Sequence, residues 1–243
     1  VGGSSSVAVN SAGDVNGDGF DDVMVEVSDI DETYVVFGKA SGFDAAMDLS
    51  GLDGSNGFRL EGRGAFSSAG DVNGDGFADV IANRTGVVFG KASGFDATMD
   101  LSNLDGSNGF RLNAEAVYDE LGYSASSAGD VNGDGFDDLI VGAPDTDFNG
   151  NFSGSSYVVF GKASGFSATM DLSGIDGSNG FRLDGVAAQD RSGGLVSSAG
   201  DVNGDGFDDV LVDTRDSGVS YVVFGKASGF DAALNLSSLD GNS

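Results

Sequence analysis

Short runs of apolar and β-branched residues alternate along this chain with stretches rich in Gly, Asp, Asn and Ser. Four such runs lie at residues 23–27, 80–81, 139–141 and 210–212, and each follows the same polar stretch. The segment Val-Val-Phe-Gly-Lys-Ala-Ser-Gly-Phe occurs four times, and Gly-Phe-Arg-Leu occurs three times. Runs of this length and composition, bounded by turn-forming residues, are typical of β-strands. The pattern therefore predicts an all-β protein.

These runs belong to one unit that is copied four times. Each unit begins with a segment ending in Ser-Ala-Gly and passes through the polar loop, the β-branched run and Val-Val-Phe to Gly-Phe-Arg-Leu, which gives four strands, A to D. The polar loops are spaced by 57, 59 and 71 residues. Four short strands with a long period favour the four-stranded antiparallel blades of a β-propeller. A β-sandwich does not predict one copied unit, and a calcium-binding β-roll requires contiguous nine-residue repeats.

We expect a single propeller domain over residues 1–243, with units at roughly 1–62, 63–113, 114–185 and 186–243. The last unit stops before its Gly-Phe-Arg-Leu segment and lacks its outer strand. Residues 1–3 align with 58–60 but do not supply that strand. Three interpretations remain open: the chain is a piece of a larger ring, two chains complete each other, or four blades close without this strand. We favour a piece of a larger ring, and expect self-association through unpaired strand edges.

The polar loop reads Asp-Val-Asn-Gly-Asp-Gly-Phe-Asp-Asp, with Ala78 at position eight of the second copy. Oxygen-bearing side chains at positions one, three, five and nine, with the carbonyl at position seven, form a donor set typical of Ca²⁺, which takes six to eight oxygens. A simple turn needs neither the ninth-position carboxylate nor identical spacing in four copies. We therefore predict about four Ca²⁺ ions, one in each repeat. The predicted ligands are Asp14, Asn16, Asp18, Phe20 and Asp22; Asp71, Asn73, Asp75, Phe77 and Asp79; Asp130, Asn132, Asp134, Phe136 and Asp138; and Asp201, Asn203, Asp205, Phe207 and Asp209.

The residues after the loop decide which class of calcium site this is. An EF-hand has a bidentate Glu at position twelve and lies between helices, whereas position twelve here is Val25, Ala82, Val141 or Val212. A β-branched run follows each loop, so the loop is predicted to join strands A and B. Position eight is not expected to be a ligand, because one copy has Ala there.

Composition narrows the range of possible functions further. The chain of 243 residues is 40% hydrophobic and contains no Cys and no His. Disulfides, thiol nucleophiles and His-based catalysis are therefore excluded. The formal net charge of −28 would be −28 + 8 = −20 with four Ca²⁺ bound, so nucleic acid and anionic membrane surfaces are poor partners. No apolar run is long enough to insert into a membrane, and any export signal is expected to lie outside this sequence.

The third loop and its sequel, from Gly129 through Asp138 to Pro144, resemble the FG-GAP repeat of the integrin α-chain β-propeller and its bacterial relatives. The resemblance extends over essentially the whole chain. It implies that the side chains at loop positions one, three, five and nine, and the carbonyl at position seven, bind calcium. Only the third unit keeps Gly-Ala-Pro, and the Phe-Gly motif survives only as Leu121, Gly122 and Tyr123. The resemblance also implies an extracellular or cell-surface setting.

Alternating strands place the A–B and C–D connections at one end of the blades, and the B–C and D–A connections at the other. The second set varies among the units, and we expect any ligand to bind there. Candidate contacts are Arg84, Tyr118, Phe152, Arg191 and Arg215, although a purely structural role is also consistent with the sequence. Lys39, Lys91, Lys162 and Lys226 recur in every unit and are predicted to be structural, as are Arg59, Arg111 and Arg182. The recurring Phe37, Phe89, Phe160 and Phe224 are predicted core residues.

The leading hypothesis is a non-enzymatic, calcium-stabilised module for adhesion, protein interaction or structural spacing in an extracellular protein. A glycan-binding propeller is the alternative. A polysaccharide-active enzyme is a third possibility, for which Asp119, Glu120 and Asp190 are the only distinctive acids, and nothing around them resembles a catalytic pair.

Overall fold

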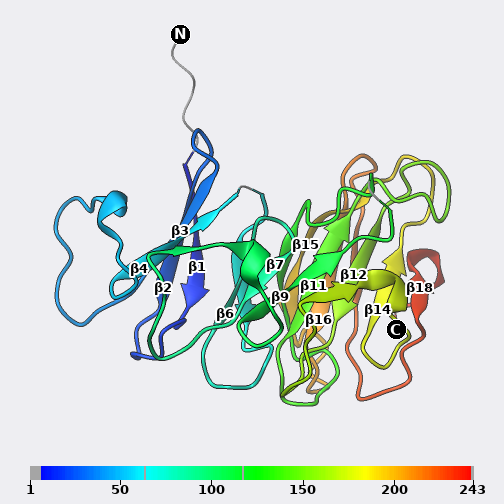
Figure 1. Cartoon of the computed structure of the whole chain (residues 1–243). Helices are drawn as coiled ribbons and strands as arrows, with labels where there is room; N and C mark the ends of the chain where they lie inside the picture. Colours follow the sequence, from blue (N-terminus) through cyan, green and yellow to red (C-terminus); the bar gives the residue numbers. More distant parts are fainter. Residues whose placement is uncertain (1–6, 63, 117, 242–243) are drawn as a thin grey trace, which may run out of the picture.

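The structure, a computed structural model, describes residues 7–62, 64–116 and 118–241. It consists of four small, mostly antiparallel sheets arranged as the blades of a propeller, and the described residues contain no α-helix (Figure 1). The alignment of residues 1–3 with a D strand falls outside the described residues. The predicted fold class is confirmed.

Blades one to three each contain the four predicted strands, and the fourth contains three. Blade one is formed by β1 (Val7–Gly13), β2 (Asp22–Val27), β3 (Glu32–Val36) and β4 (Gly57–Glu61). Blade two is formed by β5 (Ser67–Gly70), β6 (Asp79–Ala82), β7 (Gly86–Val88) and β9 (Gly109–Asn113). Blade three is formed by β10 (Ala125–Gly129), β11 (Asp138–Ala143), β12 (Ser155–Val159) and β14 (Gly180–Asp184). Blade four is formed by β15 (Ser192–Gly200), β16 (Asp209–Thr214) and β17 (Ser220–Val223).

The C–D connectors contain strands that the sequence did not predict. β8 (Thr98–Met99), β13 (Thr169–Asp171) and β18 (Ala233–Asn235) each run parallel to the D strand of the preceding blade. A 3₁₀ turn follows at Leu101–Asn103, Leu172–Gly174 and Leu236–Ser238. These strands are only two or three residues long and pair outside their own unit, so hydrophobic periodicity gives no signal for them. Each connector therefore fastens its blade to the one before it.

The core lies between successive blades. One cluster joins blades one and two, a second joins blades two and three, and a third joins blades three and four. In each, the Phe after strand C, the Phe of strand D and the Phe of the next connector pack together, with the last two rings stacked at 4.7–4.8 Å between centroids. Phe37, Phe89 and Phe160 are 6–8% exposed, as predicted, whereas Phe224 is only half-buried.

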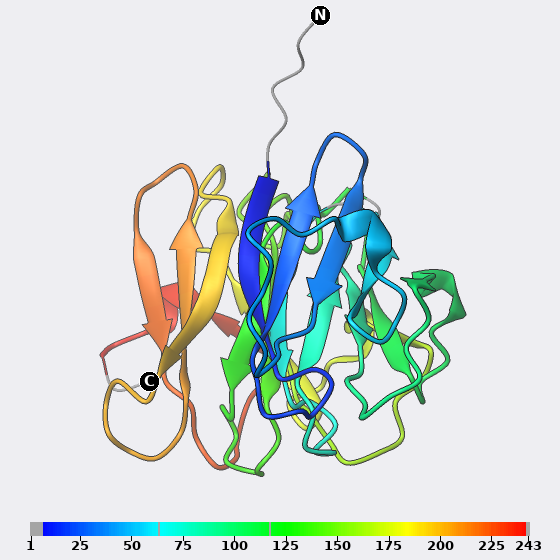
Figure 2. The ribbon, with the colours of Figure 1, turned by 90° about the vertical axis from the view of Figure 1, so that its left-hand side faces the viewer.

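All four A–B loops gather at the lower end of the blades, while the β2–β3 turn lies at the opposite end (Figure 2). This arrangement follows from the alternating strand directions. It separates the loops whose sequence recurs in all four units from the loops that vary among the units. The connector of blade one, residues 38–56, projects away from the other sheets at the left of Figure 1.

Candidate metal sites and the variable end

Each predicted calcium loop folds around its own carboxylates. In the first, the Asp14 carboxylate accepts hydrogen bonds from the Asp18 N–H at 3.0 Å and the Gly19 N–H at 2.9 Å. Asn16 Oδ1 accepts from the same Asp18 N–H, and Asp18 Oδ1 accepts from the Phe20 N–H, both at 2.9 Å. The same contacts recur in the other three loops. The nearly identical sequence thus gives four copies of one loop conformation.

Two glycines allow this conformation. Gly17 and Gly19 have φ of +71° and +87°, in the left-handed region that side chains with a Cβ disfavour. The ring of Phe77 from the next blade also lies where a Cβ on Gly17 would be, at 2.3 Å. The glycine at position four is therefore required by the turn in every loop, and by the neighbouring blade in the first three loops.

The ninth-position aspartates differ from the other loop acids because they are buried. Asp22, Asp79, Asp138 and Asp209 are 0–1% exposed and begin strand B of their blades. In each, one carboxylate oxygen accepts the N–H of loop position two and the other accepts the N–H of the Gly after strand C, at 2.7–3.0 Å. The ninth carboxylate therefore ties the loop to both strands B and C.

Burial raises the pKa of Asp79 and Asp138 to about 8 and that of Asp22 to about 6. Backbone N–H donors oppose this shift, and the negative charges of the fifth and first loop aspartates add to it. In these three loops the carboxyl groups therefore lie close enough to repel one another. Within the described part of the chain, no ion pair links them to Lys or Arg.

The donor chemistry of each loop fits a hard cation. Every side chain that we predicted as a ligand carries an oxygen, and the position-seven carbonyl adds another. Among the described residues, no group of three or more His, Cys, Asp or Glu side chains is arranged to hold a metal by itself. An ion in these loops would therefore depend on Asn and carbonyl oxygens as well as on carboxylates.

The aspartates at loop position eight have a structural role that the sequence does not predict. Asp137 Oδ2 accepts the N–H of Asp71 from the preceding blade at 2.7 Å, and Asp208 Oδ2 accepts that of Asp130 at 2.9 Å. Ala78 cannot make this bond. The presence of Asp in three of four loops was the available signal, but its acceptor role across blades required the structure.

The FG-GAP glycines of the third repeat lie where backbones from different blades meet. A Cβ on Gly122 would approach the Arg84 carbonyl to 2.2 Å, and one on Gly142 would approach the Gly193 carbonyl to 2.0 Å. The Gly122 N–H also donates to the Gly142 carbonyl at 2.9 Å. Only glycine permits these close approaches.

Comparison with known proteins agrees with this arrangement. Residues 121–159 match the family model of the FG-GAP repeat. The chain therefore contains an FG-GAP repeat within a β-propeller that is similar to integrin α-chains.

The propeller is similar to integrin alpha-V of Gallus gallus, with 28% identity over 68% of this chain and 15% of the relative. It is 34% identical to integrin alpha-E of Mus musculus over 41% of this chain and 8% of that protein. A shorter match to integrin alpha ina-1 of Caenorhabditis elegans has 50% identity over 21% of this chain and 5% of the relative. The matched part of the propeller is thus a small fraction of each relative's length. No helix in the described residues is both long and apolar enough to span a membrane.

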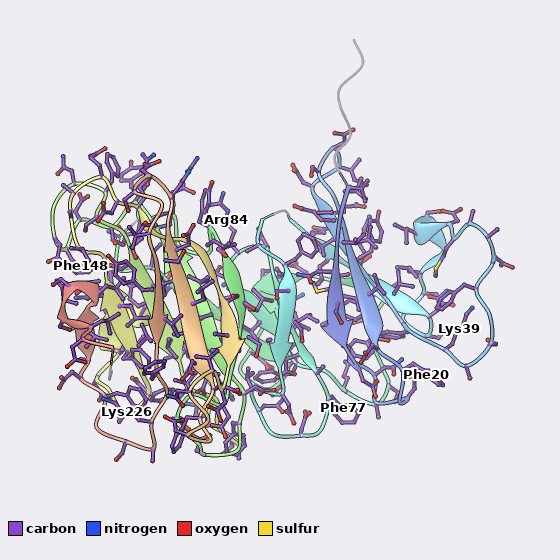
Figure 3. All side chains as sticks on the ribbon, turned by 180° about the vertical axis from the view of Figure 1, so that it is seen from behind. Phe20, Lys39, Phe77, Arg84, Phe148 and Lys226 are labelled. Carbon is purple, nitrogen blue, oxygen red and sulfur yellow. The ribbon has the colours of Figure 1, made fainter. Side chains whose placement is uncertain are left out.

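The candidate contacts at the variable end are mostly engaged with other residues of the propeller. Arg84 Nη1 pairs with Glu120 Oε2 of the next blade at 2.6 Å. Arg191 lies 3.2 Å from Asp145 and 3.5 Å from Asp216, and its guanidinium sits 5.0 Å from the Phe152 ring centre. Figure 3 shows Arg84 toward this end, opposite Phe20, Phe77 and Lys226.

Two further candidate contacts, Arg215 and Tyr118, differ in how much they interact with the rest of the propeller. Arg215 lies 5.1 Å from the Tyr123 ring centre, so it is also engaged. Tyr118 is 86% exposed, the most exposed large hydrophobic residue in the described chain. Among the candidate contacts, Tyr118 therefore contributes least to the packing of the propeller.

The recurring Lys and Arg residues have intramolecular partners, as the structural interpretation predicts. Each Lys Nζ lies 4.8–4.9 Å from the ring centre of the connector Phe four residues later. Arg59 pairs with Glu32 at 2.6 Å, and Arg182 bonds Glu115 and Asp184 while covering the Phe148 ring at 3.5 Å. Arg111 is the member of this set without an ion pair among the described residues.

The distinctive acids considered for catalysis serve local structure. Asp119 accepts the Ala116 N–H and Asp190 accepts the Ala187 N–H, each at 2.9 Å. Glu120 is paired with Arg84. Each acid therefore has a partner in a turn or across blades.

Proposed function

We propose that this FG-GAP propeller is a non-enzymatic, calcium-stabilised module for adhesion or protein interaction in an extracellular protein. The observation that carries the proposal is the fourfold loop. Four copies hold the same oxygen donors in the same hydrogen-bonded conformation, and in each the buried ninth carboxylate ties the loop to strands B and C. A cation at these loops would offset the repulsion between the carboxylates and stabilise the blades.

The ligands proposed are the side chains at positions one, three, five and nine and the carbonyl at position seven, giving about four Ca²⁺ per chain. When bound, the ion neutralises the loop carboxylates and makes the loop rigid, and its role is structural rather than catalytic. Calcium at millimolar concentration is typical of the extracellular environment that binding modules of this kind use, which supports the proposed localisation. Similarity to integrin α-chains supports the adhesion role.

Calcium stoichiometry measured by titration calorimetry tests this proposal. Asp18→Asn removes a predicted ligand carboxylate, whereas Asp21→Asn removes one charge at position eight of the same loop, on an exposed side chain. We expect the first variant to lose one of four ions and the second to retain all four. Equal losses in both variants, or no calcium binding by the wild type, would contradict the proposal.

Partner binding is proposed for the variable end. Panels of extracellular-matrix proteins and of glycans provide the probes, and Tyr118→Ser is the informative variant because its side chain is free. Loss of binding in this variant, with the calcium stoichiometry unchanged, supports a site there. Retention of binding by a variant of all five candidates would place the site elsewhere. Association between copies of the propeller, through its unpaired edges and faces, is also part of the proposal.

A further inference from the structure

Successive blades are joined by one set of backbone hydrogen bonds, copied three times. The N–H of loop position eight donates to the position-one carbonyl of the preceding blade, and the N–H of the connector Lys donates to its position-two carbonyl. These bonds are Ala78–Asp14 (2.9 Å), Asp137–Asp71 (3.2 Å) and Asp208–Asp130 (3.1 Å), and Lys91–Val15 (3.0 Å), Lys162–Val72 (2.9 Å) and Lys226–Val131 (3.0 Å). Each blade thus has a donor face toward its predecessor and an acceptor face toward its successor.

The apolar contacts of these interfaces are copied too. On the acceptor face, the Val at loop position two is buried, at 0–1% exposed in blades one to three. On the donor face, the first apolar residue of strand B is buried, at 0–1% in blades two to four. The position-seven Phe of the donor face lies over the position-four Gly of the acceptor face, as Phe77 does over Gly17.

Blade one presents the donor face without a partner. Val23 is 46% exposed, whereas its equivalent Val80 in blade two is fully buried. Phe43 is 55% exposed, whereas its equivalent Phe95 is 6% exposed. Phe20, the position-seven Phe, is 42% exposed.

Blade four presents the acceptor face without a partner. Val202 is 57% exposed, although the same position is 0% exposed in blades one and three and 1% in blade two. Leu211 and Phe224 are partly exposed, and the space above Gly204 is open. Blades one and four therefore do not bury these two faces against each other.

We propose that copies of this chain associate head to tail, with the donor face of blade one docked on the acceptor face of blade four of a second copy. This inference deepens the self-association proposed above by naming its two surfaces. The occupant is argued from the molecule itself, because each face is one half of an interface that the chain builds three times. The contact is heterologous, so it generates a ring if the rotation closes and an open chain if it does not.

The hydrogen-bonding groups of the two faces are complementary. In the part of the chain that the structure describes, no hydrogen bond reaches the N–H of Asp21 or Lys39, or the carbonyl of Asp201 or Val202. These are the positions that pair in all three internal interfaces. The Asp21 carboxylate also faces outward, where Asp137 and Asp208 accept an N–H from the preceding loop.

The docked interface is weaker than an internal one. Blade four has no described D strand, so the strand that stacks its Phe on the connector Phe of the next blade is missing. A net charge of −28 on each copy also repels the second copy. Because salt screens this repulsion, association should increase with ionic strength and with calcium.

Light scattering on the calcium-loaded protein over a dilution series tests the proposal. We expect a concentration-dependent mass above 24.3 kDa, at least twofold at the highest concentration. Phe43→Arg blocks the donor face and Val202→Arg blocks the acceptor face, and each variant alone should be monomeric. Ile30→Arg is the matched control, because Ile30 is 55% exposed in the β2–β3 turn and lies on neither face.

Mixing the two blocked variants is the decisive step. Each retains one intact face, so an equimolar mixture should form a one-to-one pair of twofold mass, which also shows that both are folded. A monomeric wild type, a blocked variant that still associates, or a mixture that stays monomeric would overturn the proposal. Calcium stoichiometry on the same samples is independent, so a calcium-loaded monomer contradicts head-to-tail docking and leaves the proposed calcium function intact.

Discussion

The ninth aspartate of each loop is a structural acceptor as well as a proposed ligand. Asp138 is fully buried and accepts the Val131 and Gly161 N–H groups, both at 2.9 Å. Asp134 in the same loop is exposed and accepts only local N–H groups through its own side chain. Two acids four residues apart therefore have separable contributions to stability.

Asp138→Ala should destabilise the propeller even when calcium is chelated. It leaves two buried N–H groups without acceptors, each costing about 1–3 kcal/mol, so we expect a loss of roughly 2–6 kcal/mol in urea unfolding. Asp134→Asn is the control, with little change in chelator and a clear loss of stability in calcium. Equal stability of Asp138→Ala and wild type in chelator would show that these hydrogen bonds do not contribute.

The Phe that recurs in each connector allows one substitution to be compared at a buried and at an exposed copy of the same repeat position. Phe95→Ala removes a buried ring stacked on Phe58 at 4.8 Å, and should cost about 3–5 kcal/mol. Phe43→Ala makes the same change at the equivalent exposed position of blade one, and should cost about 0.5 kcal/mol or less in dilute solution. Similar losses in both variants, measured by denaturant unfolding, would mean that Phe43 is buried in the protein as studied.

At the level of elements, the loops and connectors make the repeated backbone hydrogen bonds between blades, whereas strand side chains form much of the apolar core there. The strands of a blade pair within their own unit, whereas the loop and connector make the hydrogen bonds to the preceding blade. The parallel pairing of β8 with β4 puts the Arg59 N–H on the Ala97 carbonyl at 2.9 Å. Ordering the loops therefore stabilises the interfaces directly.

The pKa shifts of the loop acids predict a pH dependence for the calcium-free protein. Burial raises the pKa of Asp79 and Asp138 from 3.8 to about 8 in the folded state. The protonated form is therefore favoured by folding, and this contribution is fully present below about pH 4 and lost as pH rises through about 8. In chelator, we expect the free energy of unfolding to fall between about pH 5 and pH 8.

Calcium should reverse this trend, because the ion displaces the protons and binds more tightly at higher pH. Denaturant unfolding at several pH values, with and without calcium, measures both effects. The double variant Asp79→Asn, Asp138→Asn should flatten the profile in chelator. Stability that rises with pH in chelator would contradict the raised pKa values.

At the scale of the whole molecule, the four proposed sites should give calcium a large share of the stability. A ligand at ~100 times its Kd stabilises by ~2.7 kcal/mol per site, so four sites approach ~11 kcal/mol, against ~5–15 for a whole domain. Coupling between neighbouring blades makes full additivity an upper bound. Chelation should therefore lower Tm by roughly 10–40 °C in calorimetry. A melt unchanged by chelation would contradict a stabilising role for calcium.

Much of this architecture could be predicted from sequence because the repeat is nearly exact. Strand order, the A–B position of the loops and the core role of Phe37, Phe89 and Phe160 follow from local pattern. The connector strand β8 and the acceptor role of Asp137 could not be predicted, because each depends on a neighbour from another unit. The sequence suggests Arg84 and Arg191 as ligand contacts, but it does not show their ion pairs across blades, which depend on the packing.

The all-β repeat, the oxygen-donor loops and the separation of recurring from variable connections follow from the sequence, since each depends on residue type and spacing within one unit. Which surfaces of the units meet, and which remain exposed, depends on how the blades pack in three dimensions. Val23 and Val80 occupy the same position in the repeat, yet one is 46% exposed and the other is buried. The difference comes from the presence of a preceding blade, because burial is a property of neighbours in space rather than of the residue.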